Sequence, residues 1–460
     1  MNPRLRLRLL ALACIALAPA AHAIDLVEAW QAVAINDRGL AVVRATHAAA
    51  QPRRDQAASL WLPNVGLSAT VGVASNQTET TGAQFSAPGM GTSNGVGFNT
   101  SINGGTATRW AVSAVQPLYN PERRAQQQQL SLSADAADLE LLAGRQALML
   151  RTAERYFELA LAEEAVRVQQ RQLQAVELAA REVQDRFKLG AVPVTDTHEA
   201  QARLAAVRAE LLAAQTDLQI KRQALADSTG LAPDSLTARL PAGAIADAPL
   251  RPLDPWLADA LAGNPTLRQQ QLAGDIARQE ATKYSLGASP RVDLVAQAMA
   301  DKLSGSGDFG SASNQLSNQS IGVQVTIPLY TGGWRDAKQS EALLLADKAG
   351  AELLNGRQQV AQQVRSSWLG LNLGSQRVRA LSESVKASAS RRDATRLGQE
   401  VGHRTTLDLL RAENDSAAAQ LDLARARVGL WLDRLRLAAL AGQLDEAALQ
   451  AANEDLAAPR

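Results

Sequence analysis

The charged residues that could do chemistry in this chain gather around Asp196 and around Asp408. Thr405 lies three residues before Asp408, which is the spacing of a capping box. Asp196 lies in the first turn of an expected helix, where a carboxylate is favoured. The nearby His198 and His403 are expected to be solvated surface residues. Helix capping is therefore the chemistry that these residues alone predict at both places.

The sequence lacks the patterns of an enzyme active site. It has no glycine-rich phosphate loop, no His-Glu metal spacing and no paired acids in a pocket-forming context. We predict no catalytic residue, no cofactor and no metal site. Without the arginines of the first 23 residues, 44 of the 47 basic residues remain against 46 acidic ones, and this balance gives no support for nucleic-acid binding.

The two charged places belong to a pattern that occurs twice. Equivalent residues are separated by 211 or 212 positions: Tyr119 and Tyr330, Gly190 and Gly402, Asp196 and Asp408, Gly230 and Gly442. So regular a spacing predicts one structural unit built twice in tandem. We expect a first repeat over 24–230, a proline-rich linker over 231–255, a second repeat over 256–442 and a short tail over 443–460.

The first 23 residues have the composition of a secretory signal peptide, with a basic start, a short apolar run and a small-residue cleavage site at Ala21-His22-Ala23. The apolar run is too short to span a bilayer as a helix. We expect the mature chain to begin near Ile24, outside the cytoplasm. Cys14, the only cysteine, lies in this segment in a context that suits lipidation poorly, so the mature chain is expected to lack thiols.

Each repeat is expected to begin with a helix, about 26–59 and 256–285, and to continue with two strands. The strands are expected at about 64–76, 107–118, 290–302 and 319–329. Apolar residues alternate with small or polar ones along them, which is typical of transmembrane β-strands. The glycine-, serine- and asparagine-rich stretches at 76–106 and 303–318 are expected to be exposed loops.

An ordinary β-sandwich is the alternative for strands of this kind. Four strands are few for 460 residues, however, and the aromatic content of 3% is too low for a sandwich core. Four strands cannot close a barrel, and an open edge in a bilayer leaves backbone groups unpaired. Several chains must therefore share one barrel, and a trimer of about twelve strands is the smallest assembly that closes around a lumen.

Each repeat ends in a long helical hairpin. Apolar residues recur every seven positions, as at Leu159 and Val166 in the first repeat and at Val364 and Leu371 in the second. This spacing predicts left-handed coiled-coil packing of antiparallel helices. An outgoing helix of roughly seventy residues would be about 100 Å long, enough to cross much of a periplasm.

The paired strand ends Gln116-Pro-Leu-Tyr119 and Ile327-Pro-Leu-Tyr330, together with the paired hairpin tips, resemble the TolC family of outer-membrane channels over essentially the whole mature chain. The resemblance implies a membrane β-barrel joined to a long α-helical coiled-coil barrel, with four strands per chain. In that family a homotrimer forms a twelve-stranded barrel in outer-membrane lipid and a twelve-helix tunnel in the periplasm.

The same resemblance implies the function and the partners. It predicts the exit channel of a tripartite efflux pump or a type I secretion system. The tip would dock to a periplasmic adaptor (membrane fusion) protein and to an inner-membrane pump or ABC transporter. The cargo is not encoded in the pore, because the pump selects it. A periplasmic coiled-coil scaffold or adaptor without a pore is the competing hypothesis, which the alternating strands oppose.

In the TolC family, hydrogen bonds and ion pairs between neighbouring helical hairpins keep the tunnel shut at its periplasmic tip. By resemblance, Thr195 and Asp196 match the Thr-Asp pair at the start of one returning helix, and Arg404 matches the arginine that pairs with this aspartate. Gln399 stands where the family has a gate tyrosine, so an amide replaces the aromatic hydroxyl. On its own residue type, Arg404 could equally be a solvated loop residue.

Asp408 matches the first acidic ring of the family's constriction, a role compatible with helix capping. Arg411 stands where the second acidic ring falls, so the neck is expected to alternate in sign, and Glu199, related to Arg411 by the repeat, could neutralise it. The residues expected to contact the adaptor are Leu189, Gly190, Val401 and Gly402. The two glycines would also turn the chain in any helical hairpin.

Overall fold

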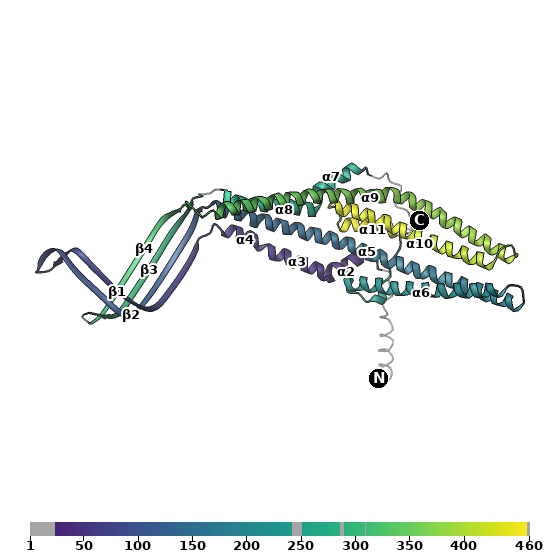
Figure 1. Cartoon of the computed structure of the whole chain (residues 1–460), viewed down its shortest axis with the longest axis horizontal. Helices are drawn as coiled ribbons and strands as arrows, with labels where there is room; N and C mark the ends of the chain where they lie inside the picture. Colours follow the sequence, from purple (N-terminus) through teal and green to yellow (C-terminus); the bar gives the residue numbers. More distant parts are fainter. Residues whose placement is uncertain (1–23, 242–250, 286–288, 309, 458–460) are drawn as a thin grey trace, which may run out of the picture. The chain divides into compact units, whose positions relative to one another are not determined.

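The computed structural model describes residues 24–241, 251–285, 289–308 and 310–457, so the predicted signal peptide and Cys14 lie outside the described residues. The chain forms two compact units, and each sequence repeat contributes to both (Figure 1). One unit holds the chain up to Ala49, Ala136–Gln271 and Gly350 onward; the other holds Ala50–Asp135 and Leu272–Ala349. Within the described ranges, every helix is too polar or too short to be a membrane span.

The strands form one antiparallel sheet in the order β1-β2-β3-β4. Their bounds are β1 (Asn64–Ala87), β2 (Gly91–Tyr119), β3 (Arg291–Gly307) and β4 (Gly310–Thr326). The outer strands β1 and β4 are not paired with each other, so within the described chain the sheet is open at both edges.

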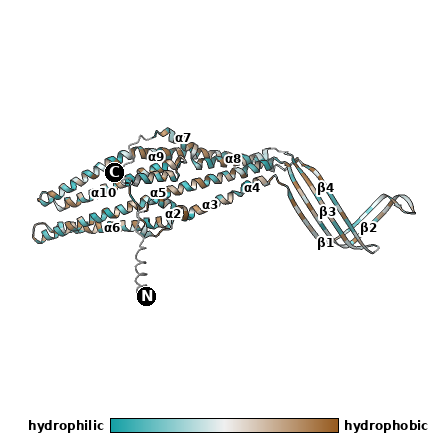
Figure 2. Cartoon of the chain, turned by 180° about the vertical axis from the view of Figure 1, so that it is seen from behind, coloured by the Kyte–Doolittle hydropathy of each residue, from teal (hydrophilic) through white to brown (hydrophobic). Residues whose placement is uncertain are grey.

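The strand register gathers the apolar residues on one face of the sheet. Leu67 of β1 lies opposite Val112 of β2, which lies opposite Ala298 of β3, and Leu294 of β3 lies opposite Val323 of β4. Residues directly opposite each other share a face, and the face alternates along each strand. The other face holds the intervening residues, which are mostly small, polar or charged: Ser68, Ser113, Asp293, Gln297 and Gln324. Figure 2 shows the alternation in colour.

The loops predicted at 76–106 and 303–318 are wrong, because the described residues of both stretches are strand except for the turns at 88–90 and at Asp308. β1 and β2 remain paired as far as Ala87 and Gly91, and β3 and β4 as far as Gly307 and Gly310. Strands whose two faces are both exposed need no apolar periodicity, because backbone hydrogen bonds hold the ladder. The strands are therefore longer than the sequence predicted, and register shifts interrupt the extended part of the β1–β2 pair.

The predicted first helix is three helices: α2 (Leu26–Asn36), α3 (Arg38–Ala50) and α4 (Pro52–Ser59). Asp37 breaks it with an extended backbone, and Pro52 starts the third piece. The predicted second helix is likewise two, α7 (Leu253–Gly263) and α8 (Pro265–Ser285). Between them Asn264 accepts a 3.1 Å hydrogen bond from the amide of Leu267.

The long helices form two antiparallel hairpins. The first consists of α5 (Pro121–Lys188) and α6 (Val194–Thr229), and the second of α9 (Trp334–Glu400) and α10 (Thr406–Leu440). Val364 and Val378, which lie on the predicted heptad stripe, are 1% and 2% exposed. Their cluster includes Leu430 of α10, so the apolar stripes pack within the hairpin as predicted.

The largest core of the first unit collects residues from both ends of the chain. Trp30 of α2, Phe157 of α5 and Leu225 of α6 are buried together. The tail adds Leu449 from α11 (Glu446–Ala457), and the side chain of Asn453 bonds the backbone amide of Leu26. A short 3₁₀ turn, η2 (Pro233–Ser235), follows α6. The tail thus packs on the first helix of the described chain.

Candidate functional site

The two hairpin tips have the same turn geometry. Gly190 and Gly402 both have a positive φ, 71° and 79°, and each amide bonds the carbonyl three residues earlier. In both tips the amide of the next residue bonds the carbonyl five residues earlier, as in a Schellman motif. A residue with a Cβ is disfavoured at these positions, and the two glycines lie at the equivalent place in the two repeats.

The helices that leave the tips begin differently. Thr405 caps α10: its hydroxyl accepts from the amide of Asp408 at 3.1 Å, and the Asp408 carboxylate accepts from the amide of Thr405 at 3.1 Å. This confirms the predicted capping box. The equivalent residue in the first repeat, Pro193, makes no side-chain cap, so α6 starts without one.

The capping contacts shape the charge of Asp408. Its pKa is lowered from the ordinary value of a carboxyl group, first because Thr405 donates hydrogen bonds to the ionised form, and further because Arg404 and Arg411 are nearby positive charges. Asp408 is therefore ionised at neutral pH, but its charge is engaged in the cap and partly offset within its own chain.

Asp196 of the first repeat has a different environment. Its carboxylate accepts only a long 3.4 Å hydrogen bond from the hydroxyl of Thr195 among the described residues. With Thr405 and Leu407, it lines a small cavity of about 100 Å³ between the starts of α6 and α10. The half-buried Asp196 thus faces the opposite hairpin across this cavity.

Polar contacts join the two hairpins behind the tips. The amide of Gln399, which is 3% exposed, donates a 2.8 Å hydrogen bond to Oε1 of Glu182 on α5. The same oxygen pairs with Arg186 at 2.8 Å. Further back, Asn414 of α10 accepts a 3.1 Å bond from Gln172, and it also accepts from Arg203. Both hairpins therefore hold one another through side chains close to the turns.

A small apolar cluster lies beside these polar contacts. Val176 and Ala179 of α5 pack with Val207 of α6 and Leu410 of α10, and all four are buried. The cluster is small compared with the core around Trp30, so the hairpins are joined more loosely near the tips than at their bases. Such a contact can separate without unfolding either hairpin.

Comparison with known proteins decides the family. A family model described as outer membrane efflux protein matches residues 29–231 and 256–443. The chain belongs to the outer membrane efflux protein family. It is therefore an outer-membrane channel protein rather than an enzyme, and the family predicted from the strand ends and tips is confirmed.

Named relatives agree with this family. The outer membrane protein TolC of Escherichia coli strain K12 is 27% identical over 443 residues, covering 95% of this chain and 85% of TolC. The alkaline protease secretion protein AprF of Pseudomonas aeruginosa is 28% identical over 344 residues, covering 74% of this chain and 70% of AprF. The crystal structure of the outer membrane protein VceC from Vibrio cholerae has the same fold, with a TM-score of 0.71 and 20% identity, covering 91% of this chain and 96% of VceC.

In this efflux-family chain the residues predicted for the gate lie at the tips but do not all meet. Among the described residues, no ion pair joins Asp196 to Arg404. Arg404 is exposed, and its stem lies against Gly398, where an added Cβ would come within 2.8 Å of Cγ of Arg404. Arg411 is also exposed. The roles of these residues in gating remain predictions.

The residues predicted to contact an adaptor are placed where a partner can reach them. Leu189 and Val401 are 84% and 69% exposed beside the two glycines. Large apolar side chains exposed at both turns are consistent with a docking surface. His198 and His403 are exposed as well, as predicted.

The partner of Gln399 was not predictable from the sequence. Glu182 lies two turns before the end of α5, in a helix rich in similar acidic residues, and nothing in its spacing marks it. Asn414, Gln172 and Arg203 were also missed, since polar pairs between helices depend on the packing of the hairpins.

Proposed function

We propose that three copies of this chain form one channel that leads from the periplasm through the outer membrane. The observation that carries the proposal is a sheet with one continuous apolar face and two open edges, β1 and β4. In lipid an open edge leaves N–H and C=O groups unpaired at a cost of several kcal/mol each. Pairing β4 of one copy with β1 of the next removes both edges, and about twelve strands enclose a lumen.

The polar sheet face then lines the pore. Arg109 and Asp301 lie on this face and pair at 2.7 Å, and Asp293 and Gln297 share it. The apolar face, with Leu67 and Val323, meets lipid. This division supports a barrel with a wet interior over a sandwich, which would require a second layer to cover the apolar face.

The helical hairpins form the periplasmic part of the proposed channel, with the gate at their tips. Asp196 faces a small cavity without an ion-pair partner in its own described chain, and Arg404 is exposed on the neighbouring turn. We infer that Asp196 pairs with Arg404 of an adjacent copy in the closed state. The hydrogen bond between Gln399 and Glu182 holds the two hairpins of one copy together close to these proposed ion pairs.

An adaptor opens the gate by competing for these contacts. The exposed Leu189 and Val401 offer apolar anchors at the turn, and the contacts to be displaced are few. A partner can shift the equilibrium only by binding the open tip more tightly than the closed one. The partners proposed are a periplasmic adaptor and an inner-membrane pump or ABC transporter.

Cysteine crosslinking tests the shared barrel. Leu67→Cys in β1 and Val323→Cys in β4 place thiols on the apolar face of the two edge strands, in a mature chain expected to contain no other thiol. In a scan of neighbouring residues, mild oxidation should link edge pairs into species of two and three chains. Each single-cysteine variant serves as the control, and a scan that yields only uncrosslinked chains contradicts the proposal.

Efflux and protein secretion are the two candidate uses of the proposed channel. AprF is named for protease secretion, and TolC carries no cargo in its name. We propose that the cargo depends on the transporter. Deleting the gene for this chain should have one of two effects. Sensitivity of the cells to dyes and detergents would indicate efflux, and loss of export of a secreted protein would indicate secretion.

A further inference from the structure

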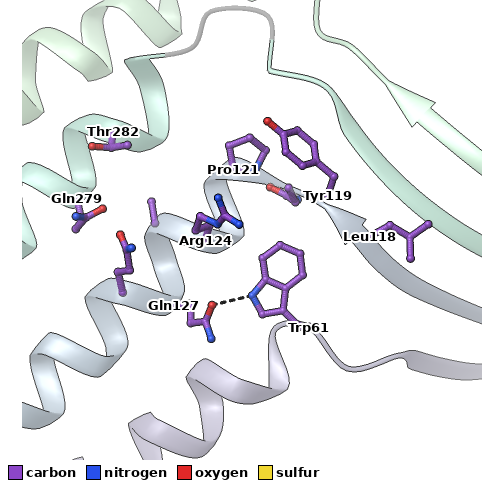
Figure 3. A pocket seen from close by; sticks show the side chains of 11 residues that line it. Trp61, Leu118, Tyr119, Pro121, Arg124, Gln127, Gln279 and Thr282 are labelled. Atoms are coloured by element: carbon purple, nitrogen blue, oxygen red, sulfur yellow. Dashed lines mark hydrogen bonds between the residues drawn. The ribbon is translucent and has the colours of Figure 1, made fainter.

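A pocket of about 500 Å³ lies where β2 ends and α5 begins (Figure 3). Its lining comes from the end of α4, the end of β2, the first turns of α5 and the last turns of α8. The residues used below are Trp61, Leu118, Tyr119, Arg124, Gln127 and Gln279. None of them takes part in the proposed gate, and the volume is that of a small-molecule site.

The pocket opens on the apolar side of the sheet. Tyr119 lies opposite Val292 in the register, and Val292 shares its face with Leu294 and, across the sheet, with Val325. Leu118 lies in the register shift between Pro117 and Tyr119, where the regular alternation of faces is interrupted, and Leu118 and Tyr119 are 52% and 47% exposed. If the apolar face meets lipid, as the proposed function requires, the pocket lies at the end of the barrel that faces the periplasm.

Hydrogen bonds hold the walls in place. The indole N–H of Trp61 donates to Gln127 at 2.9 Å (Figure 3). The backbone carbonyl of Trp61 accepts from Gln116 at 2.6 Å. Arg123 donates to the carbonyl of Leu60 at 2.7 Å. Tryptophan and tyrosine prefer the boundary between lipid and water, where a ring can be apolar at one end and hydrated at the other.

Arg124 gives the pocket a positive charge. It is exposed, and no carboxylate occurs among the described residues that line the pocket. The equivalent residue of the second repeat, Arg335, lies 211 positions later, is 6% exposed and pairs with Glu122 at 2.6 Å. The second repeat therefore shows this arginine satisfied by an acid of the chain, whereas the first repeat leaves it facing a pocket.

We infer that this pocket binds the phosphate-bearing headgroup of a phospholipid from the leaflet that faces the periplasm. The guanidinium of Arg124 pairs with the phosphate, because its planar donors match phosphate oxygens. Trp61 and Tyr119 flank the glycerol region, and the acyl chains run along Leu118 and the apolar strands. Each chain holds one such lipid, which fixes the depth of the barrel in the membrane.

Native mass spectrometry of the complete complex tests this inference, which rests on the proposed outer-membrane channel. The probes are dioleoyl phosphatidylglycerol and dioleoylglycerol, which lacks the phosphate. The wild-type complex should retain one phosphatidylglycerol per chain. Arg124→Gln should weaken its binding by about five-fold, the value of one arginine near a lipid surface. Arg124→Lys should keep most of it, and Arg181→Gln, an exposed arginine elsewhere on α5, should change nothing.

Three results would overturn the lipid assignment. In the first, the Arg124→Gln complex retains as much phosphatidylglycerol as the wild type. In the second, the substitution weakens the binding of dioleoylglycerol as much as that of phosphatidylglycerol. In the third, inorganic phosphate at the same concentration displaces the lipid. The last result would indicate a free-anion site. Channel recordings of the same variants separate this failure from failure of the proposed function. If all variants conduct while lipid retention is unchanged, the inference falls and the channel stands. If the wild type does not conduct, the channel proposal itself falls.

Discussion

The side-chain amide of Gln399 lies 2.8 Å from Oε1 of Glu182 and joins the two helical hairpins of one chain just behind their tips. Gln399 is nearly fully buried. If its side-chain amide is removed, the carboxylate of Glu182 keeps only its ion pair with Arg186. A hydrogen bond to a charged group contributes about 1.5–3 kcal/mol. This contact therefore holds the proposed closed tip without any aromatic hydroxyl.

Gln399→Leu should loosen the tip. Removing the bond should raise the ratio of open to closed channels by about ten-fold or more, because the bond contributes at least about 1.5 kcal/mol and each 1.4 kcal/mol is about ten-fold. Single-channel recording measures it as longer or more frequent openings. Glu177→Ala is the matched control, because Glu177 pairs with Arg208 at 2.8 Å within one hairpin. Equal gating in the Gln399 variant and this control would remove Gln399 from the gate.

Asp196→Arg and Arg404→Asp should each open the channel, and their combination should close it again. Each single change replaces an attraction between adjacent copies by a repulsion. Because the ion pair is partly exposed, we expect the ratio of open to closed channels to rise by about five-fold. The double variant restores the pair with reversed signs. Conductance of all three, compared in one bilayer preparation, checks this. An additive double variant would mean that the two residues do not meet.

Arg411→Asp should raise the preference for cations. In the wild type, Arg404 and Arg411 both lie near the negative charge of Asp408, so the acidic ring of the proposed trimer would be only partly negative. The substitution removes one cation per chain and adds a carboxylate in the neck. Reversal potentials in a salt gradient measure the preference. An unchanged potential would place the side chain outside the conducting path.

Acid should weaken the start of α10. The pKa of Asp408 is lowered in the folded chain, so its contribution is fully present above the ordinary pKa of 3.8 and is lost as the pH falls through the folded value. Hydrogen exchange of the first-turn amides of α10 should therefore be slow at about pH 6 and faster near about pH 3, after correction for intrinsic rates. Thr405→Ala should abolish this difference by removing the cap.

The start of α6 is the internal control for that experiment. Its first residue follows Pro193, which makes no side-chain cap, so its first-turn amides should show no comparable dependence on Asp408 or Thr405. A similar pH response at both helix starts would assign the effect to the whole tip rather than to the capping box.

The sequence predicted the parts of this fold that obey a local period. Alternation marked four strands, the heptads marked the long helices, and the 212-residue spacing placed both turning glycines. The Thr405–Asp408 cap was also predictable, because it depends on residues three apart. Each of these features is determined by neighbours in the chain.

Features set by tertiary contacts were not predictable. The polar extensions of β1 and β2 have no apolar period and were taken for loops, although backbone pairing makes them strands. The breaks of the first helix at Asp37 and Pro52 were also missed, although a proline in the first turn of a helix is a local signal. The bond between Gln399 and Glu182 joins residues 217 positions apart, so only the packed hairpins show it.

The number of chains in the detergent-solubilised complex tests the central claim most directly. Mass photometry or sedimentation of the purified mature protein should give about three times the mass of one chain, because four strands with open edges need about twelve to close a lumen. A protein that stays monomeric and dissolves without detergent would contradict the shared barrel, and with it the channel built on it.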